Sequence, residues 1–206
     1  MRVIGLTGGI ASGKSLVSQQ LAELGAVLVD ADKLGHETYR KGTETHAAVA
    51  QAFGPGVVAT DGEIDRKALG AKVFADPEAR CRLEEIVWPA IRRLASARLA
   101  GLEAEGVPVV VLEAAVLIEA NWLDLADEVW LVEASPDVVR ERLAARNGLG
   151  PEQAEARLRA QLTNEKRRPF AGVVIENDGT LEELRRRVDE AWSQLQTRVA
   201  SGERVG

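Results

Sequence analysis

The chain is poor in the residues that build disulfide frameworks and metal clusters. Its 206 residues include one cysteine, Cys81, and two histidines, His36 and His46. A single cysteine excludes an intramolecular disulfide and a cysteine-rich metal site, and two histidines are too few for a histidine metal centre. We therefore expect a reducing, intracellular setting, with the histidines as surface or substrate-side polar residues.

Long apolar runs and excess positive charge are also missing. No apolar stretch approaches the ~18 residues that cross a bilayer, and Met1-Arg2 leads directly into a short apolar run and not into a signal sequence. The formal net charge is -6, which argues against a broad nucleic-acid-binding surface. These absences predict a cytoplasmic protein, a monomer or weak homo-oligomer, that binds neither nucleic acid nor membrane and recognises any phosphate groups locally.

What remains is an ordinary globular composition, 46% hydrophobic and 28% charged. Short apolar segments, each apolar enough to be covered on both faces, alternate with segments of helical periodicity. The expected strands are residues 3–6, 26–29, 107–112, 129–132 and 173–175, and helices are expected over 14–24, 136–147, 150–164 and 180–200. This alternation predicts an α/β fold with a parallel sheet of about five strands.

Between the second and third strands, the pattern is helical and interrupted. Thr43 and Asp65 are typical helix caps, and Asp76-Pro77 is a cap followed by proline at the first helical position. A helical block inserted in an α/β core usually supplies the second wall of a cleft. We assign it to the acceptor substrate, with scaffold packing as the alternative.

The strongest motif follows the first strand and fits G-x-x-x-x-G-K-[ST], with a predicted helix after it. Glycines allow backbone N–H groups to wrap a phosphate, the lysine neutralises the β- and γ-phosphates, and the final hydroxyl can bind Mg²⁺. The strand and helix on either side disfavour a chance glycine-rich turn. The motif predicts ATP and Mg²⁺ as cofactors, held by Gly8, Gly9, Ile10, Ala11, Ser12, Gly13, Lys14 and Ser15.

Two carboxylates, Asp30 and Asp32, close the second strand at the edge where open α/β sheets bind ligands. If the strand geometry persists, both point to the same face. A carboxylate here can accept the proton of an attacking hydroxyl. We predict this role for Asp32, with Asp30 in support; the alternative is that either residue caps the following helix.

Two further acids follow apolar segments. Glu113 ends the third strand, where P-loop proteins often carry an acid that contacts the metal directly or through water. Glu119 follows residues 116–118 and is predicted to line the acceptor cleft. For both, a solvated loop acid is the alternative.

Arginines are numerous after residue 136, and most are expected to be solvated and ion-paired. Arg142 and Arg146 lie four residues apart on one helix face, so they are predicted to act from a lid on the transferring phosphoryl group. After the last strand, Asn177 and Gly179 belong to a short polar turn predicted to edge the adenine ring. An ordinary Asx-Gly turn is the alternative there.

Taken together, residues 6–15 and 24–32 resemble the start of the dephospho-coenzyme A kinase family. The resemblance continues through Phe53-Gly54, Asp61-Gly62, Asp65-Arg66, Leu69, Val73-Phe74, Pro89, Leu117-Ile118-Glu119, the helix of Arg142 and Arg146, and Asn177-Asp178-Gly179. It spans residues 3 to about 199 and is far more specific than the phosphate loop alone.

The resemblance implies a P-loop nucleoside triphosphate hydrolase fold that uses ATP and Mg²⁺ to phosphorylate the 3'-hydroxyl of the ribose in dephospho-coenzyme A, the last step of coenzyme A synthesis. It implies a core over 1–32, 106–136 and 170–200, a coenzyme-binding insert over 33–105, a lid over 137–169 and a flexible tail over 201–206. By position, Asp32 matches the proposed base and Arg142 the nucleotide-side lid arginine. Thr7 joins the phosphate loop, and the substrate side comprises Asp32, His36, Arg66, Leu117 and Glu119.

The chain departs from the common family pattern at two places. Ala115-Val116-Leu117 replaces a frequent Pro-Leu-Leu, and Trp88 replaces a histidine before the helix proline. At both places, Ala115 of the Glu113-Ala114-Ala115 stretch and Trp88, the chain is similar to the kinase domain of bifunctional coenzyme A synthase. Neither departure removes a phosphate-handling group.

Two rival functions use the same motif. Another small-metabolite kinase, such as a shikimate kinase, is disfavoured because the third strand lacks a Gly-Gly-x-Gly stretch. A nucleotide-dependent switch is suggested by the D-x-x-G of residues 32–35, but the N-K-x-D base reader of a GTPase is missing. Acceptor-dependent turnover distinguishes a kinase from such a switch.

Overall fold

The computed structural model describes residues 1–147 and 150–201, apart from the side chains of Arg146, Asn147, Pro151 and Ala154. The chain divides into two compact units. One comprises Met1–Val29 with the chain from Gly101 onward, and the other comprises Asp30–Ala100. The second unit overlaps the insert predicted over 33–105, whereas residues 202–206 of the predicted tail lie outside the described part.

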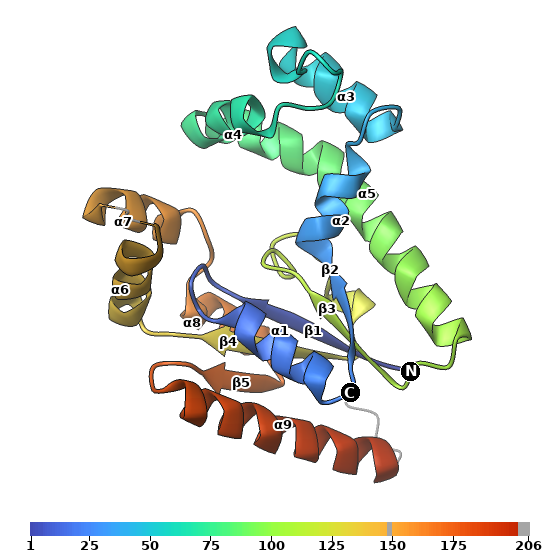
Figure 1. Ribbon diagram of the computed structural model, residues 1–206, viewed down its shortest axis with the longest axis vertical. Coiled ribbons are helices and arrows are strands. Elements are labelled where there is room, and N and C mark those ends of the chain that lie inside the picture. The colour runs from blue at the N-terminus through green and yellow to red at the C-terminus, as the bar shows by residue number, and fades with distance from the viewer. Residues whose placement is uncertain (148–149, 202–206) are drawn as a thin grey trace. The chain divides into compact units, whose positions relative to one another are not determined.

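The first unit is built on a five-stranded parallel sheet of order β2-β3-β1-β4-β5 (Figure 1). The central strand β1 (Arg2–Gly8) lies between β3 (Val109–Glu113) and β4 (Glu128–Glu133), with β2 (Val27–Asp30) and β5 (Val173–Glu176) at the edges. Register pairs Leu6 with Glu113 and Gly8 with Val132. The carboxyl ends of β1, β3 and β4 therefore meet at one edge, as the sequence predicted for a P-loop fold.

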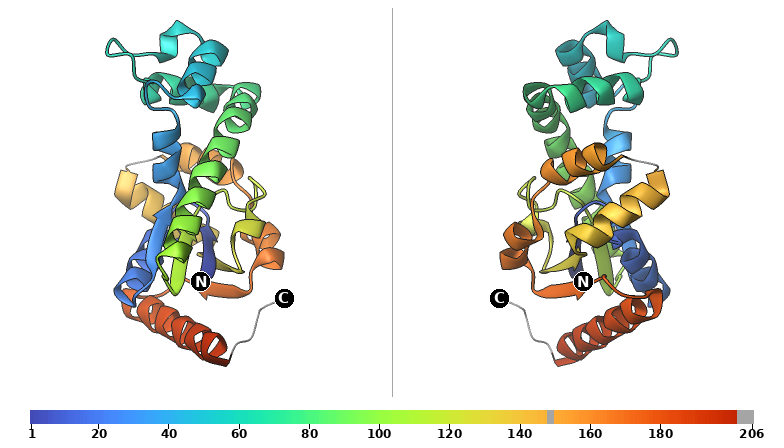
Figure 2. Two further views of the ribbon diagram at one scale, coloured as in Figure 1. Left: turned by 90° about the vertical axis from the view of Figure 1, so that its right-hand side faces the viewer. Right: turned by 90° about the vertical axis from the view of Figure 1, so that its left-hand side faces the viewer.

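Helices cover both faces of this sheet because its central strands are apolar on both sides. Figures 1 and 2 show α1 (Lys14–Glu23) and α9 (Leu181–Ser201) side by side on one face, with α8 (Asn164–Arg167) on the other. Between the sheet, α1 and α9 lies a continuous core, which includes Ile4, Leu6, Val17, Leu21, Val111, Trp130, Val132, Ile175, Val188 and Leu195. The rest of this unit comprises α6 (Pro136–Asn147), α7 (Pro151–Arg159), η2 (Leu123–Leu125) and η3 (Arg168–Phe170).

Both ends of α9 are held by polar contacts. At its start, Thr180 N–H donates to Glu183 at 2.7 Å while the Thr180 hydroxyl accepts from Glu183 N–H, forming a capping box. The Thr180 backbone N–H thereby holds the pKa of the Glu183 carboxyl below its usual range. Because the folded-state pKa is depressed, the stabilisation is present at neutral pH and is lost as the pH falls through that carboxyl's titration.

Near its end, α9 is tied to β4 by a buried carboxylate. Arg198 donates to both oxygens of Glu128, at 3.1 and 2.8 Å, and the Trp130 indole donates to Glu128 at 3.0 Å. The Glu128 side chain is 3% exposed. Removing the guanidinium would leave a buried carboxylate without its cation, which is strongly destabilising.

Arg198→Ala is therefore expected to lower the free energy of unfolding by about 3 kcal/mol. The control is Arg186→Ala on the same helix, whose partner Glu190 is 55% exposed, and its effect should stay within about 0.5 kcal/mol. Urea unfolding followed by circular dichroism measures both. Equal losses in the two variants would contradict the anchoring role of Glu128.

The second unit is helical. It contains α2 (Ala31–Thr38), α3 (Glu44–Phe53), η1 (Pro55–Val57), α4 (Arg66–Ala75) and the part of α5 (Pro77–Ala104) up to Ala100. The predicted caps are confirmed: Thr43 accepts from His46 N–H, and Asp65 accepts from Lys67 and Ala68 N–H. Cys81 lies exposed on the first turns of α5. Pro89 sits inside the same helix.

Two expectations about local structure are wrong. The strand geometry does not persist to Asp32, because Asp30 ends β2 and its carboxylate accepts from Lys33 N–H, which starts α2. Asp32 is therefore in the first turn of a helix. The helix predicted over 150–164 ends at Arg159, because Thr163 caps a separate short helix, α8.

Candidate active site

The connection between β1 and α1 is a phosphate-binding loop held by close backbone contacts. A Cβ at Gly8 would clash with the Val132 carbonyl oxygen, so β4 permits only glycine there. Gly13 adopts a φ of 97° at the helix N-cap, the left-handed region that favours glycine. The loop thus delivers the first turn of α1, with its unpaired N–H groups, to the carboxyl edge of the sheet.

Two predicted nucleotide residues support this loop. The Asn177 amide donates to the Ser12 carbonyl at 2.7 Å and is buried, directly after β5. Arg142 of α6 donates to the Ala11 carbonyl at 3.2 Å and to the Asn177 carbonyl at 2.8 Å. Arg142 and Asn177 therefore both donate to backbone carbonyls of the phosphate loop. Arg146 lies in α6, but its side chain is outside the described part.

Lys14 and Glu113 form an ion pair at the carboxyl ends of β1 and β3. Lys14 Nζ lies 2.8 Å from Glu113 Oε1, and each side chain is 12% exposed. Ser15 follows in the first turn of α1 and is exposed. An ammonium and a carboxylate thus lie together beside the loop where the phosphates of a bound nucleotide would enter, and the residue after the lysine carries a hydroxyl.

This donor set fits Mg²⁺. Among residues 1–147 and 150–201, no group of three His, Cys, Asp or Glu side chains forms a ready-made metal cage. Mg²⁺ at a P-loop needs no such cage, since waters and substrate phosphates fill most of its coordination sphere. One hydroxyl from Ser15 and one carboxylate from Glu113 are the oxygens that the chain would provide.

A second set of contacts on the loop was not predicted from the sequence. Gln161 Oε1 accepts from the Ile10 N–H at 2.8 Å. The Arg167 side chain, 2% exposed, donates to Glu119 Oε1 at 3.1 Å, and its Nη1 lies 3.3 Å from where a Cβ of Gly9 would be. No sequence motif marks these residues.

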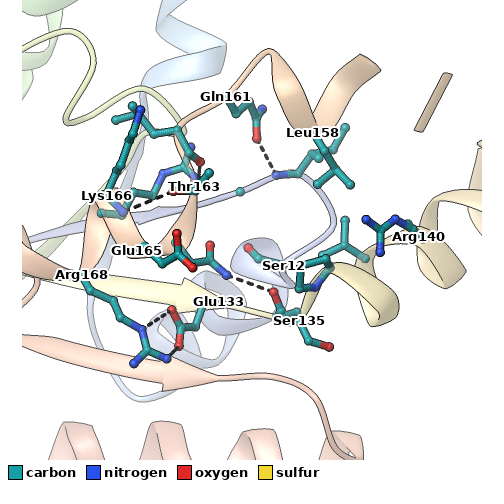
Figure 3. Close-up of a pocket in the computed structure, with 18 of the residues that line it drawn as sticks. Ser12, Glu133, Ser135, Arg140, Leu158, Gln161, Thr163, Glu165, Lys166 and Arg168 are labelled. Atoms are coloured by element: carbon teal, nitrogen blue, oxygen red, sulfur yellow. Dashed lines mark hydrogen bonds and ion pairs between the residues drawn. The ribbon is translucent and has the colours of Figure 1, made fainter. Parts of the chain in front are cut away.

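Gln161 and Arg167 line a pocket of about 900 Å³ in the α/β unit (Figure 3). Gly9, Ile10 and Ser12 of the phosphate loop form one side, and the ends of β4 and β5 form another. The remaining wall comes from α6, α7, α8 and their connections. Figure 3 shows Gln161 reaching from this wall to the loop.

Two other predicted residues have core positions. Leu117 is fully buried and packs against Gly5 of β1, and its contact with substrate stays a prediction. Thr7 is also fully buried, and its hydroxyl donates to the Ala115 carbonyl at 3.4 Å. Gly179 directly precedes the capping box of α9, where a Cβ would strike Glu183.

The remaining predicted residues lie in the helical unit. Asp32 and His36 are exposed on α2, and Arg66 is exposed at the start of α4. The His36 ring meets Tyr39 edge-on, with centroids 6.3 Å apart. Burial raises the pKa of the Tyr39 hydroxyl, and the nearby Arg66 guanidinium opposes that rise. His36, Tyr39 and Arg66 thus gather polar and cationic groups within one unit.

A central strand that runs into a glycine-rich loop, a lysine at the start of the next helix and an acid on the neighbouring strand define a P-loop nucleotide-binding protein, a class in which the bound nucleotide is usually accompanied by Mg²⁺. No helix of residues 1–147 or 150–201 has the length and apolar character to cross a membrane.

Comparison with known proteins agrees with this class. A dephospho-CoA kinase from Geobacter sulfurreducens is 53% identical over 194 residues, which cover 94% of this chain and 98% of the relative. A crystal structure from Thermus thermophilus superposes with a TM-score of 0.78 at 36% identity, covering 94% and 97% of the two chains. The dephospho-CoA kinase from Campylobacter jejuni gives a TM-score of 0.71 at 25% identity, with 95% and 98% covered.

The family model described as dephospho-CoA kinase matches residues 2–183. The chain belongs to the dephospho-CoA kinase family.

Proposed function

We propose that the protein transfers the γ-phosphoryl group of ATP to the ribose 3'-hydroxyl of dephospho-coenzyme A, giving coenzyme A and ADP. The observation that carries this proposal is the Lys14–Glu113 pair beside the phosphate-binding loop, in a chain of this family. The substrate oxygen attacks the γ-phosphorus, the bond to the β-phosphate oxygen breaks, and ADP leaves. The hydroxyl proton passes to a carboxylate, for which we propose Asp32.

The phosphate loop and Lys14 hold and neutralise the β- and γ-phosphates. Ser15, with Glu113 through water, would hold Mg²⁺, which when bound offsets phosphate charge and orients the γ-phosphoryl group. Lys14 then has two alternative anionic partners, Glu113 and the nucleotide. Exchange between them keeps the ammonium paired throughout, which avoids an unpaired charge at a site that is largely buried.

On the nucleotide side, Arg142 and Asn177 hold the loop through its Ala11 and Ser12 carbonyls. The residues proposed to contact ATP are Arg142, Arg146, Asn177 and Gly179. On the acceptor side, Asp32, His36, Arg66 and Glu119 are proposed to bind dephospho-coenzyme A. Cationic and neutral donors such as Arg66 and His36 suit a substrate that carries a pyrophosphate.

The test is ADP release from Mg-ATP by the purified protein, with dephospho-coenzyme A, AMP, adenosine and shikimate supplied separately and the product mass recorded. We expect turnover with dephospho-coenzyme A alone and a product heavier by one phosphate. Faster turnover with another acceptor would reassign the substrate. Slow hydrolysis that ignores every acceptor would instead indicate a nucleotide-dependent switch.

A further inference from the structure

Residues 161–168, here called the strap, connect α7 to η3 and contact three parts of the α/β unit. Gln161 reaches the phosphate loop at Ile10, and Asn164 donates to the Ala134 carbonyl at 3.0 Å, just past β4. Arg167 reaches Glu119 in the turn that follows β3, and Arg168 is paired with Glu133 at the end of β4. The strap is therefore fixed at several points on the carboxyl edge of the sheet.

Gln161 holds the tip of the phosphate loop. Its Oε1 accepts the Ile10 N–H at 2.8 Å. The next residue, Ala11, has a φ of 56°, which is unfavourable for a residue with a Cβ. A hydrogen bond to the adjacent amide helps to maintain that conformation, because it would be lost if the loop relaxed.

Arg167 places a positive charge beside Gly9 of the same loop. Its side chain is 2% exposed, with one Nη on Glu119 Oε1 and the other on the Leu162 carbonyl. Its Nη1 also packs on Gly9, where a Cβ would lie 3.3 Å away. Arg167 Nε and Glu119 Oε2 are both buried without a hydrogen-bond partner.

Such an incompletely paired ion pair is a poor way to gain stability. Burying two charges is costly, and unsatisfied lone pairs and N–H groups add to that cost. A hydrophobic pair of similar size would serve folding alone at least as well. The cost is understandable if the guanidinium charge beside Gly9 is needed for the anionic ligand of the phosphate loop.

We propose that Gln161 and Arg167 are positioning residues for nucleotide binding, with Gln161 fixing the loop through the Ile10 amide and Arg167 supporting Gly9 with positive charge. Glu119 holds Arg167 in place and so connects the turn after β3 to the phosphate loop. The inference rests on the proposed use of ATP by this loop. It differs from the proposed role of Arg142 in the part of the loop that is contacted, because Arg142 reaches Ala11 whereas the strap reaches Gly9 and Ile10.

The test compares two glutamines of the same region by calorimetric titration with ATP and with ADP. Gln161→Met keeps the side-chain length but removes the acceptor, whereas Gln153→Met makes the same change at an exposed position of α7. Losing one hydrogen bond that orders the binding loop should weaken the Kd of both nucleotides roughly tenfold in Gln161→Met. Gln153→Met should bind as wild type does, and both variants should keep the wild-type Tm.

Arg167→Met tests the charge. It should weaken ATP binding more than ADP binding, because the extra phosphate adds negative charge near the loop. If this variant does not fold, the comparison of Gln161→Met with Gln153→Met decides whether the proposal holds.

Unchanged nucleotide affinity in Gln161→Met, or a loss of Tm without a loss of affinity, would overturn the proposal. A wild-type protein that binds ATP but phosphorylates no dephospho-coenzyme A would overturn the proposed function instead and leave this comparison valid.

Discussion

Lys14→Ala is expected to lower ATP-dependent phosphoryl transfer by about 10³-fold or more, to the limit of detection. The substitution removes the ammonium that offsets the charge of the β- and γ-phosphates. It also leaves Glu113, 12% exposed, with its negative charge uncompensated at the place where the phosphates enter. Electrostatic stabilisation of the transferring group is therefore lost and replaced by repulsion.

The measurement is kcat/KM for ADP release in the presence of dephospho-coenzyme A, with circular dichroism to show that the fold is intact. Arg186→Ala serves as the control, because it also removes a cation but from an exposed pair on α9. Its activity should match that of wild type. Full activity in Lys14→Ala would be incompatible with the assignment of this loop to ATP.

Asp32→Asn is expected to lower kcat by about 10²-fold or more with little change in KM. Asparagine has the same shape and can still hydrogen-bond to a hydroxyl, but it cannot take up the proton.

Asp30→Asn is the matched comparison. Asp30 caps α2 through Lys33 N–H, and asparagine caps helices as well as aspartate does. Its kcat should therefore fall far less than that of Asp32→Asn. If Asp32→Asn instead raises KM and leaves kcat intact, Asp32 is a substrate-binding residue and another group takes the proton.

Local patterns predicted the parts of the fold that depend on neighbouring residues. Within residues 2–23, the strand follows from an apolar run, the glycine-rich loop from its motif, and the helix from its periodicity. The caps Thr43 and Asp65 follow from a short polar side chain placed before a helix. Each of these depends on interactions between residues a few positions apart, which a sequence displays directly.

Contacts between distant residues could not be predicted in the same way. Glu119 and Arg167 are 48 positions apart, and Gln161 and Ile10 are 151 apart. A charged residue that will be buried has the same local signature as a solvated one, so Arg167 was indistinguishable from its neighbours Lys166 and Arg168. The prediction that Asp30 and Asp32 share one strand face failed for a different reason, because the Asp30 side chain caps α2 and the helix begins at Ala31, before Asp32.

The lone thiol on α5 has a practical consequence. Because Cys81 is exposed and the sequence holds no other cysteine, a maleimide dye would attach at a single known place on the helical unit of every chain, without prior mutagenesis. The four tryptophans can donate excitation energy to such a dye. The native protein is thus ready for fluorescence titrations in which the addition of each substrate is followed in real time.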